Sequence, residues 1–351
     1  MVDPSERILD ANLNRAREAL RVLEDYARFA LEDAALTTAA KTLRHTLADA
    51  VQQAGLTGLI AARDIVGDIG CSIAAAGEYE RASLTEVVLA AGKRLTEALR
   101  AIEEVGKTRS GSFGAAIERM RYGAYDLEKR LAVRMNPCRA FVQARLYVLI
   151  TESLCIDGWL STAEAALRGG ADVLQLREKT LGDCELLERA KRLARLCHDA
   201  GALCIVNDRP DVALLAGADG VHVGQDDLPV AEARRVVGQE RIAGVSTHSL
   251  EQARAAIAAS PDYLAVGPMF ETTTKAVDRI AGPALWSVVR QETALPLVAI
   301  GGITADNVDE LVKLGCRCVA VCQTVVGAAD VEAAARRLRT LLEGDPSVSR
   351  G

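Results

Sequence analysis

Residues 171–180, which read ADVLQLREKT, decide the fold because they join an apolar strand to a charged end. The apolar letters are typical of a buried strand, yet three polar side chains alternate with them. Successive side chains on a strand point to opposite sides, so these three share one face: Gln175, Arg177 and Lys179. An amide, a guanidinium and an ammonium group on one face of such a strand indicate either solvent or a bound anion.

Seven further strand-like runs surround this stretch in the second part of the chain. In order, the eight runs are RLYVLIT (145–151), DVLQLRE (172–178), LCIVND (203–208), GVHVG (220–224), IAGVST (242–247), DYLAVGP (262–268), LPLVAIG (295–301) and CVAVCQ (318–323). Segments with helical periodicity, such as CELLERAKRLARLCHDAG (184–201), fill the gaps. Apolar strands joined by helices predict a parallel sheet covered on both faces. Eight such units predict an α/β fold with a closed (β/α)8 TIM barrel, with a doubly wound open sheet as the alternative.

The chain changes character near residues 136 and 137. Before this point the sequence has helical periodicity and lacks strand-like runs, and 351 residues exceed a comfortable single core. Pro137 is a natural helix terminator. We therefore expect an all-α domain over 1–135, a linker over 136–144, the barrel over 145–345 and a flexible tail over 346–351.

Composition narrows the classes of partner. A net charge of -6 and 3% aromatic residues argue against nucleic-acid binding. The N-terminus, MVDPSERILD, lacks the features of a signal peptide, and no apolar run is long enough to cross a membrane. The nine cysteines lie mostly in apolar patterns without a CxxC pair, which indicates buried thiols in a reducing compartment. We expect a cytoplasmic protein that binds small molecules rather than nucleic acid or membrane; self-association stays open.

Polar clusters follow most of the predicted strand ends, where the working groups of such barrels project. Four cations come from loops that a barrel would bring together: Arg177, Lys179, Arg209 and Lys275. Convergent Arg and Lys side chains predict an anion with several oxygens, most simply phosphate or diphosphate. Three acids lie beside them: Asp208, Asp226 and Asp227. Carboxylates next to a phosphate site favour Mg2+; salt bridges to Arg209 and Lys179 are the alternative.

A second phosphate site is predicted after the seventh strand. The run AIGGIT (299–304) offers backbone N–H groups, and Gly301 and Gly302 permit close approach of a ligand. Thr272 and Thr274 would reach the same place. The sequence shows no Ser-His-Asp arrangement, and we interpret His222 and His248 as structural hydrogen-bonding groups.

Six ordered motifs carry a resemblance to a known family. They are QLREK (175–179), NDR (207–209), HVGQDD (222–227), GVSTH (244–248), GPMFETTTK (267–275) and AIGGIT (299–304). Together they closely resemble thiamine-phosphate synthase (thiamine phosphate pyrophosphorylase), over residues 145–343. The resemblance implies a transferase that joins 4-amino-5-hydroxymethyl-2-methylpyrimidine diphosphate to a thiazole phosphate, giving thiamine phosphate and diphosphate. It also implies Mg2+ as cofactor and a dissociative reaction that needs no protein nucleophile.

The resemblance assigns roles residue by residue. Pyrimidine diphosphate would lie against Gln175, Leu176, Arg177, Glu178, Lys179, Asn207, Ser246 and Lys275. The metal would be held by Asp208 and Asp227, and the thiazole phosphate by Thr272, Thr273, Thr274, Gly301, Gly302, Cys322 and Gln323. Electrostatic catalysis is implied for Arg177, Lys179, Ser246 and Lys275. This chain departs from the family after the eighth strand, where VAVCQT (319–324) replaces a small hydroxyl residue. The contact of Cys322 and Gln323 with phosphate is therefore expected through the backbone.

Two other functions of the barrel stay open at this point. One is a thiazole tautomerase, which would need less of the diphosphate and metal set. The other is a thiamine sensor or scaffold without catalysis, which would tolerate loss of Lys179 and Lys275. Both lysines are present, so the sequence favours the synthase.

The helical domain contains an internal repeat. NRAREALRVLEDYAR (14–28) matches KRLTEALRAIEEVGK (93–107) at an offset of 79. Charged positions recur in both halves, as Arg15/Arg94, Glu18/Glu97, Arg21/Arg100 and Glu24/Glu103. The domain resembles a module often found ahead of thiamine-phosphate synthase and associated with phosphorylating hydroxymethylpyrimidine phosphate. The sequence lacks a GxxxxGK[ST] loop. Kinase activity, substrate binding and dimerisation stay open, as do charge pairs on solvated helix faces.

Overall fold

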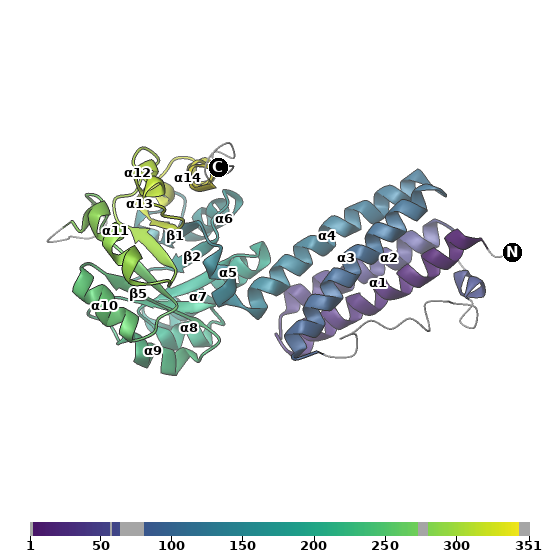
Figure 1. Cartoon of the computed structure of the whole chain (residues 1–351), viewed down its shortest axis with the longest axis horizontal. Coiled ribbons are helices and arrows are strands. Elements are labelled where there is room, and N and C mark those ends of the chain that lie inside the picture. Colours follow the sequence, from purple (N-terminus) through teal and green to yellow (C-terminus); the bar gives the residue numbers. More distant parts are fainter. Residues whose placement is uncertain (1–2, 57, 64–80, 273–279, 344–351) are drawn as a thin grey trace. The chain divides into compact units, whose positions relative to one another are not determined.

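The computed structural model describes residues 3–56, 58–63, 81–272 and 280–343. The chain divides into two compact units, Met1–Met135 and Asn136–Gly351. The first unit is helical and the second contains the barrel (Figure 1).

In the described part of the first unit, four long helices pack side by side (Figure 1). They are α1 Pro4–Phe29, α2 Ala34–Gln53, α3 Leu84–Lys107 and α4 Gly111–Met135, with the 3-10 turn η1 Leu59–Ala62 after α2. Capping fixes where they begin: the Asp33 carboxylate accepts the N–H groups of Ala35 and Leu36 at 3.0 and 2.9 Å. Apolar side chains at helical spacing, such as Leu20 and Leu99, fill the core between them.

The internal repeat is present in three dimensions as a repeated ion pair. Arg44 Nε on α2 donates to Glu24 Oε2 on α1 at 2.9 Å. Arg121 Nε on α4 donates to Glu103 Oε2 on α3 at 2.8 Å. Both glutamates are buried, so each half of the unit ties its two helices together through matching atoms.

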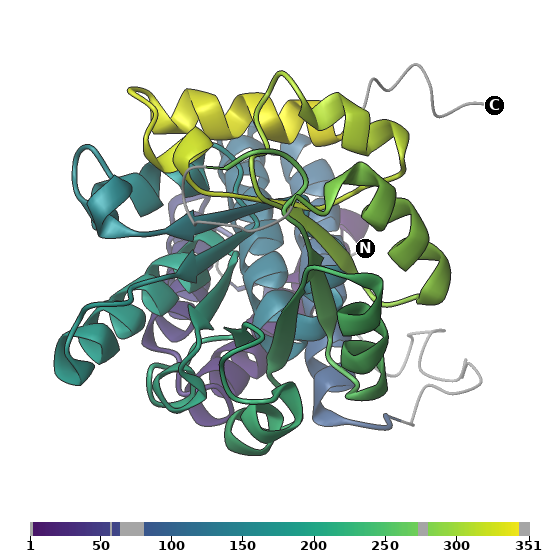
Figure 2. The ribbon, with the colours of Figure 1, turned by 90° about the vertical axis from the view of Figure 1, so that its left-hand side faces the viewer.

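The second unit is a closed parallel barrel whose strands follow one another in chain order (Figure 2). The strands are β1 Leu146–Ile150, β2 Val173–Leu176, β3 Leu203–Asn207, β4 Gly220–Val223, β5 Ile242–Thr247, β6 Tyr263–Val266, β7 Leu297–Ile300 and β8 Val319–Val321. β8 pairs with β1, with Ala320 opposite Tyr147. The sheet therefore closes, which confirms the predicted TIM barrel over the open sheet.

Helices surround the barrel strands (Figure 2). They are α6 Trp159–Arg168, α7 Asp183–Ala200, α8 Pro210–Leu215, α9 Val230–Val237, α10 Leu250–Ala258, α11 Gly282–Glu292, α12 Val308–Lys313 and α14 Val331–Glu343. Shorter elements are α5 Pro137–Val142, η3 Glu152–Leu154 and α13 Gln323–Val326. Strand residues such as Val148, Leu174 and Val221 are fully buried in the apolar core of this unit. Because side chains alternate along a strand, the intervening residues face the barrel interior.

Aromatic rings fill the floor of the barrel, at the end where the strands begin. Tyr147 and Tyr263 are buried there, and Phe141 of α5 stacks on Tyr263 with ring centroids 4.3 Å apart. Gly244 on β5 provides the space, since a Cβ at this position would lie 2.1 Å from the Tyr263 ring. The segment expected to be a linker therefore contains a helix that packs into the barrel floor.

Three aspartates connect neighbouring strands by hydrogen bonds at the end of the barrel where the strands begin. They immediately precede β2, β4 and β6: Asp172, Asp219 and Asp262. Each carboxylate accepts a backbone N–H of the preceding odd-numbered strand, namely from Leu146 at 3.1 Å, Cys204 at 2.8 Å and Ala243 at 2.7 Å. Each also has a nitrogen partner from a helix: Arg339, His198 and Arg234. Each of the three carboxylates thus has hydrogen-bond partners. This agrees with a stabilising role for the N-terminal end of the barrel strands.

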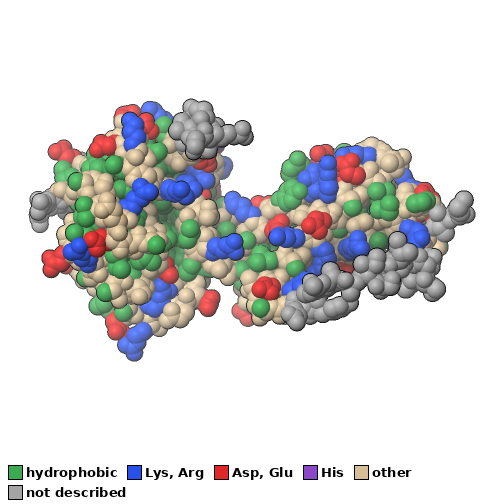
Figure 3. Space-filling model, in the orientation of Figure 1, with side chains coloured by type: hydrophobic (Ala, Val, Ile, Leu, Met, Phe, Trp, Pro, Cys, Tyr) green, Lys and Arg blue, Asp and Glu red, His purple; other side chains and the backbone are tan. Residues whose placement is uncertain are grey.

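Acidic and basic side chains are interspersed on the face that Figure 3 shows, on both units. This agrees with a small net charge made from many charged residues of both signs. Within the described ranges, every helix is too short or too polar to cross a membrane.

Candidate active site

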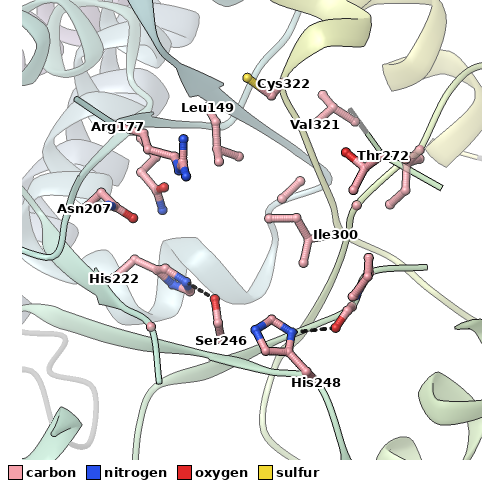
Figure 4. Close-up of a pocket in the computed structure, with 18 of the residues that line it drawn as sticks. Leu149, Arg177, Asn207, His222, Ser246, His248, Thr272, Ile300, Val321 and Cys322 are labelled. Atoms are coloured by element: carbon pink, nitrogen blue, oxygen red, sulfur yellow. Dashed lines mark hydrogen bonds between the residues drawn. The ribbon is translucent and has the colours of Figure 1, made fainter. Parts of the chain in front are cut away.

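A cavity of about 660 Å³ opens at the end of the barrel where the strands finish. Each strand, or the loop that follows it, contributes to the lining. Arg177 and Asn207 lie on one side, and Thr272 and Val321 lie opposite them (Figure 4). The cavity therefore occupies the place where the catalytic groups of this fold are usually found.

Most of the residues singled out from the sequence meet in this cavity. Its lining includes Gln175, Arg177, Lys179, Asn207, Asp208, Asp226, Asp227, Ser246, Thr272, Gly301, Gly302, Cys322 and Gln323. Three further expected residues, Thr273, Thr274 and Lys275, lie outside the described residues. Segments up to 148 residues apart in sequence, from Gln175 to Gln323, thus converge on one site.

Two of the expected contacts do not line the cavity. Leu176 is buried in the apolar core between the strands and the outer helices. The Glu178 carboxylate accepts the Glu152 N–H at 2.7 Å and lies 3.8 Å from Arg189. Both alternate with inward-facing neighbours, so the strand geometry that turns those neighbours inward turns these two away.

Arg209 also takes a different place from the one expected. Its guanidinium pairs with Asp183 at 2.6 Å and with Asp211 at 2.7 Å, and it does not line the cavity. Two carboxylates already neutralise it, so the convergence of cations on this site involves Arg177 and Lys179 among the described residues.

One wall of the cavity carries a lysine and two adjacent carboxylates. Lys179 Nζ donates to Asp208, which also contacts Asp227, and Asp227 accepts the Gly224 N–H at 2.7 Å. Burial raises the pKa of Asp208, and the neighbouring Asp227 raises it further against the effect of Lys179. Burial also disfavours ionised Asp227, but hydrogen bonds from Asp208 and Gly224 lower its pKa overall. The two carboxyls therefore hold a proton between them more readily than separate carboxyls would.

This pair fits the donor set for a divalent cation. Within the part of the chain that the structure describes, no group of three or more His, Cys, Asp or Glu side chains is arranged as a metal site. Mg2+ needs only one or two carboxylates when phosphate oxygens and water supply its other ligands. A cation beside Asp208 and Asp227 would also offset the repulsion between them. Asp208 adopts a left-handed backbone conformation, with φ 63°, which is uncommon for a residue with a side chain.

The opposite wall is formed by backbone that comes close to the cavity. Gly301 and Gly302 have φ values of 96° and 67°, in the region that favours glycine. A Cβ on Gly302 would lie 2.2 Å from the Glu271 carbonyl oxygen. Asn307 Nδ2 donates to the Gly302 carbonyl at 2.9 Å and holds this turn in place. Only glycine fits here, which leaves backbone exposed to a ligand.

The same wall is completed after β8 by Cys322 and by Gln323, the first residue of α13. Burial raises the pKa of the Cys322 thiol to about 11, although Arg177 acts in the opposite direction. The thiol is therefore neutral near pH 7 and is a poor nucleophile.

A chain of buried hydrogen bonds leads from the cavity to the barrel floor. His222 Nε2 lies 2.8 Å from Ser246 Oγ, and His222 Nδ1 lies 2.8 Å from the Tyr263 hydroxyl (Figure 4 shows the first). The Tyr263 hydroxyl lies 3.1 Å from that of Tyr147, which accepts from Gln175 Nε2 at 2.7 Å. The sequence predicts a structural hydrogen-bonding role for His222 but does not identify its partners Tyr263 and Ser246. The alternation of side chains along the strands could have indicated this network. Its five members all occupy inward-facing strand positions: Tyr147, Gln175, His222, Ser246 and Tyr263.

Comparison with known proteins is specific for both units. A family model described as thiamine monophosphate synthase matches residues 146–325, and a model of the ThiD2 family matches residues 7–130. The thiamine-phosphate synthase of Rhodopirellula baltica is 42% identical over 349 residues, covering 97% of this chain and 93% of that protein. That of Thermosynechococcus vestitus is 42% identical over 346 residues, covering 97% and 96%.

A solved structure supports the same assignment for the barrel. Thiamine phosphate pyrophosphorylase from Pyrococcus furiosus superposes with a TM-score of 0.54 at 36% identity. The match covers 58% of this chain and 97% of that protein. On its motifs, its barrel and its full-length relatives, this chain belongs to the thiamine-phosphate synthase family of transferases.

Proposed function

We propose that this chain condenses 4-amino-5-hydroxymethyl-2-methylpyrimidine diphosphate with a thiazole phosphate, releasing diphosphate and forming thiamine phosphate. The observation that carries the proposal is the joint presence of Lys179, Arg177 and the Asp208–Asp227 pair in one cavity, opposite the glycine turn. Cations and a carboxylate pair suit a metal-bound diphosphate, and exposed backbone suits a second phosphate.

The pyrimidine diphosphate would occupy the side of the cavity formed by β2, β3 and β5. Gln175 and Asn207 line the cavity and offer amide groups to the pyrimidine ring. Arg177 and Lys179, which follow β2, and Ser246 of β5 would donate to diphosphate oxygens. In this assignment, amide groups bind the pyrimidine ring, and two cations and a hydroxyl bind the leaving diphosphate.

Mg2+ would be held by Asp208 and Asp227. When bound, the ion would neutralise charge on the diphosphate and so make it a better leaving group. The contact between Lys179 and Asp208 places a further positive charge at the same point.

The thiazole phosphate would lie against the opposite wall. Gly301 and Gly302 offer backbone N–H groups there, and Thr272 lies in the loop after β6. Cys322 and Gln323 would contribute mainly through their backbone, because a neutral thiol is a weak donor. From the resemblance alone, Thr273 and Thr274 are expected on this side, and Lys275 is expected beside the diphosphate.

The proposed chemistry needs no nucleophile from the protein. The bond between the methylene carbon and the diphosphate oxygen breaks, and its electron pair leaves with diphosphate. The thiazole nitrogen then gives its lone pair to the methylene cation, which forms the new carbon–nitrogen bond. Arg177 and Lys179 stabilise charge on the departing oxygens. Leu149, Ile300 and Val321 give the cavity apolar walls that limit access of water to the cation.

The assay that tests the proposal supplies both substrates and Mg2+ and detects thiamine phosphate. Asp227→Asn should raise the Mg2+ concentration needed for half-maximal rate by at least about tenfold. Asp183→Asn is a matched control, because that exposed carboxylate pairs with Arg209 outside the cavity. Turnover of the thiazole phosphate alone would favour the tautomerase, and binding of thiamine without turnover would favour the sensor.

The assay also separates the roles left open for the helical unit. One arm supplies pyrimidine monophosphate and ATP in place of the diphosphate. Product in this arm requires phosphorylation by this chain, whereas product from the diphosphate alone leaves the unit with binding or association. The ion pairs Glu24–Arg44 and Glu103–Arg121 already account for two of the repeated charges as structural contacts. We place the reaction in the cytoplasm, which eight free cysteines in the described residues support.

A further inference from the structure

In the buried chain of hydrogen bonds below the cavity, the donor and the acceptor of each bond can be assigned. Gln175 Nε2 carries hydrogens and no lone pair for accepting, so it donates to the Tyr147 oxygen at 2.7 Å. The Tyr147 proton must then go elsewhere, and the Tyr263 oxygen lies 3.1 Å away. Both rings are buried, so leaving that proton without an acceptor would be unfavourable. Tyr147 therefore donates to Tyr263.

The same reasoning fixes the next two bonds. The Tyr263 oxygen accepts from Tyr147, so its own proton points to His222 Nδ1 at 2.8 Å. Nδ1 is then an acceptor, and a neutral imidazole carries its single proton on Nε2. His222 Nε2 consequently donates to Ser246 Oγ at 2.8 Å.

The opposite direction does not fit the contacts. A proton on His222 Nδ1 would make Tyr263 accept from the ring and donate to Tyr147. The Tyr147 oxygen would then receive two protons, from Tyr263 and Gln175, and its own proton would have no partner in the chain.

Ser246 lies where this chain of bonds meets the cavity (Figure 4). Because its oxygen accepts from His222, its hydroxyl proton is left to point away from the imidazole and toward a ligand. We propose that Tyr263 and His222, at the end of the chain of bonds that starts at Gln175 and Tyr147, hold the Ser246 hydroxyl as a hydrogen-bond donor to the departing diphosphate. His222 and Tyr263 are then positioning residues that act through Ser246, and this role rests on the proposed function.

The tautomer can be measured on the unmodified full chain. The sequence has only four histidines, so protein labelled with 15N in histidine gives four ring systems by long-range 1H–15N correlation. His222→Gln identifies the relevant signals by their loss. We expect a neutral ring with the proton on Nε2 at neutral pH. A proton on Nδ1, or a doubly protonated ring, would overturn the proposal whether or not the enzyme is active.

A kinetic cycle tests whether Tyr263 acts through Ser246. Ser246→Ala should lower kcat roughly 100-fold, and Tyr263→Phe roughly tenfold. With alanine at position 246, Tyr263→Phe should change kcat by less than about twofold, because the two act as one unit. Losses that multiply in the double variant would overturn the proposal.

Tyr147→Phe is the matched control, since it removes an equally buried hydroxyl one step further from the cavity. Tyr263 still has His222 Nδ1 as its acceptor, so the direction toward Ser246 is kept. We expect a higher KM for the pyrimidine diphosphate, because Gln175 loses its partner, and a smaller loss of kcat than in Tyr263→Phe. Equal losses of kcat would indicate a packing effect and overturn the proposal. Absence of thiamine phosphate from the unmodified protein would instead refute the proposed function.

Discussion

Glu103 in the helical unit and Asp208 in the barrel are both withdrawn from solvent, but their neighbours differ. Glu103 is fully buried and receives hydrogen bonds or ion pairs from Arg100, Lys107 and Arg121, each at 2.8 Å. Asp208 has one lysine and a second carboxylate beside it. Burial alone would raise the pKa of both, yet the cations lower that of Glu103 to about 2, whereas that of Asp208 is raised.

The different surroundings of Glu103 and Asp208 suit a stabilising role for the first and a binding role for the second. Around Glu103 the positive charges are already in place, so the cluster has no need of a ligand. Around Asp208 and Asp227 the negative charges exceed the local positive ones, so the site remains ready for a cation. Removing one partner from the complete cluster would leave a buried charge unpaired, whereas the incomplete cluster can accept a cation.

The largest effect is expected from Asp208→Asn, which should lower the rate of thiamine phosphate formation roughly 1,000-fold. The substitution removes a charge from the proposed metal pair, while asparagine tolerates the left-handed backbone at this position. Asp211→Asn, three residues along, removes a carboxylate that pairs with Arg209 and should leave the rate within about twofold. Similar rates for Asp208→Asn and the unmodified enzyme would contradict the contrast between the two clusters.

Glu103→Gln should lower the free energy of unfolding of the helical unit by about 3 kcal/mol, because it leaves the buried Arg121 without a charge partner. Hydrogen exchange of α3 and α4 amides in the full chain would measure the loss. Glu104→Gln affects only an exposed carboxylate and should change this free energy by less than about 1 kcal/mol. Equal losses in the two variants would show that the buried cluster has no special role.

The same carboxylate predicts a pH dependence. The pKa of Glu103 falls from 4.5 to about 2 on folding, so the folded state binds its proton less tightly than the unfolded state. Its stabilising contribution is therefore complete above pH 4.5 and is lost as the pH falls toward about 2. Protection factors of α3 and α4 amides, which correct for the intrinsic pH dependence of exchange, should fall over this interval. In Glu103→Gln the fall of the protection factors should be weaker, and a pH profile equal to that of the unmodified protein would contradict the assignment.

The smallest effect has the opposite sign. Asp208→Asn should raise the free energy of unfolding of the barrel by about 0.5 kcal/mol, because the like charge beside Asp227 disappears while the lost contact with Lys179 is partly exposed. Urea unfolding followed by hydrogen exchange in β3 and β4 would detect it. A clear loss of stability would mean that the lysine contact outweighs the repulsion between the carboxylates.

Much of the barrel site was predictable, because strand periodicity fixes which residues reach the cavity. Gln175, Arg177 and Asn207 follow from alternation and from their position near strand ends. The expectation for Leu176 and Glu178 came from the contiguous motif, and alternation itself argues against a place in the cavity. Arg209 depended on which carboxylates its side chain reaches, and Asp183 is 26 residues away in sequence. Such long-range pairing has no signal in a single sequence.

The polar interior was harder to foresee. Tyr147 and Tyr263 lie in apolar runs of the sequence. A tyrosine in such a run is predicted to be an ordinary core residue, because the sequence does not show which group its hydroxyl contacts. In the helical unit, the repeat identified Glu24 and Glu103 as equivalent. Their partners Arg44 and Arg121 lie beyond the matched segments, so the ion pairs appear only once α2 and α4 are packed.

The stacking of Phe141 on Tyr263 bears on how this chain can be recombined. The ring that supports Tyr263 from below belongs to α5, ahead of the first barrel strand. A fusion of this barrel to another domain, whether natural or engineered, must therefore place the junction before Asn136. Only then does the barrel retain α5 and the Phe141 ring that covers its floor. Cutting at the first strand would preserve every residue that lines the cavity and still open the space beneath its buried hydrogen bonds.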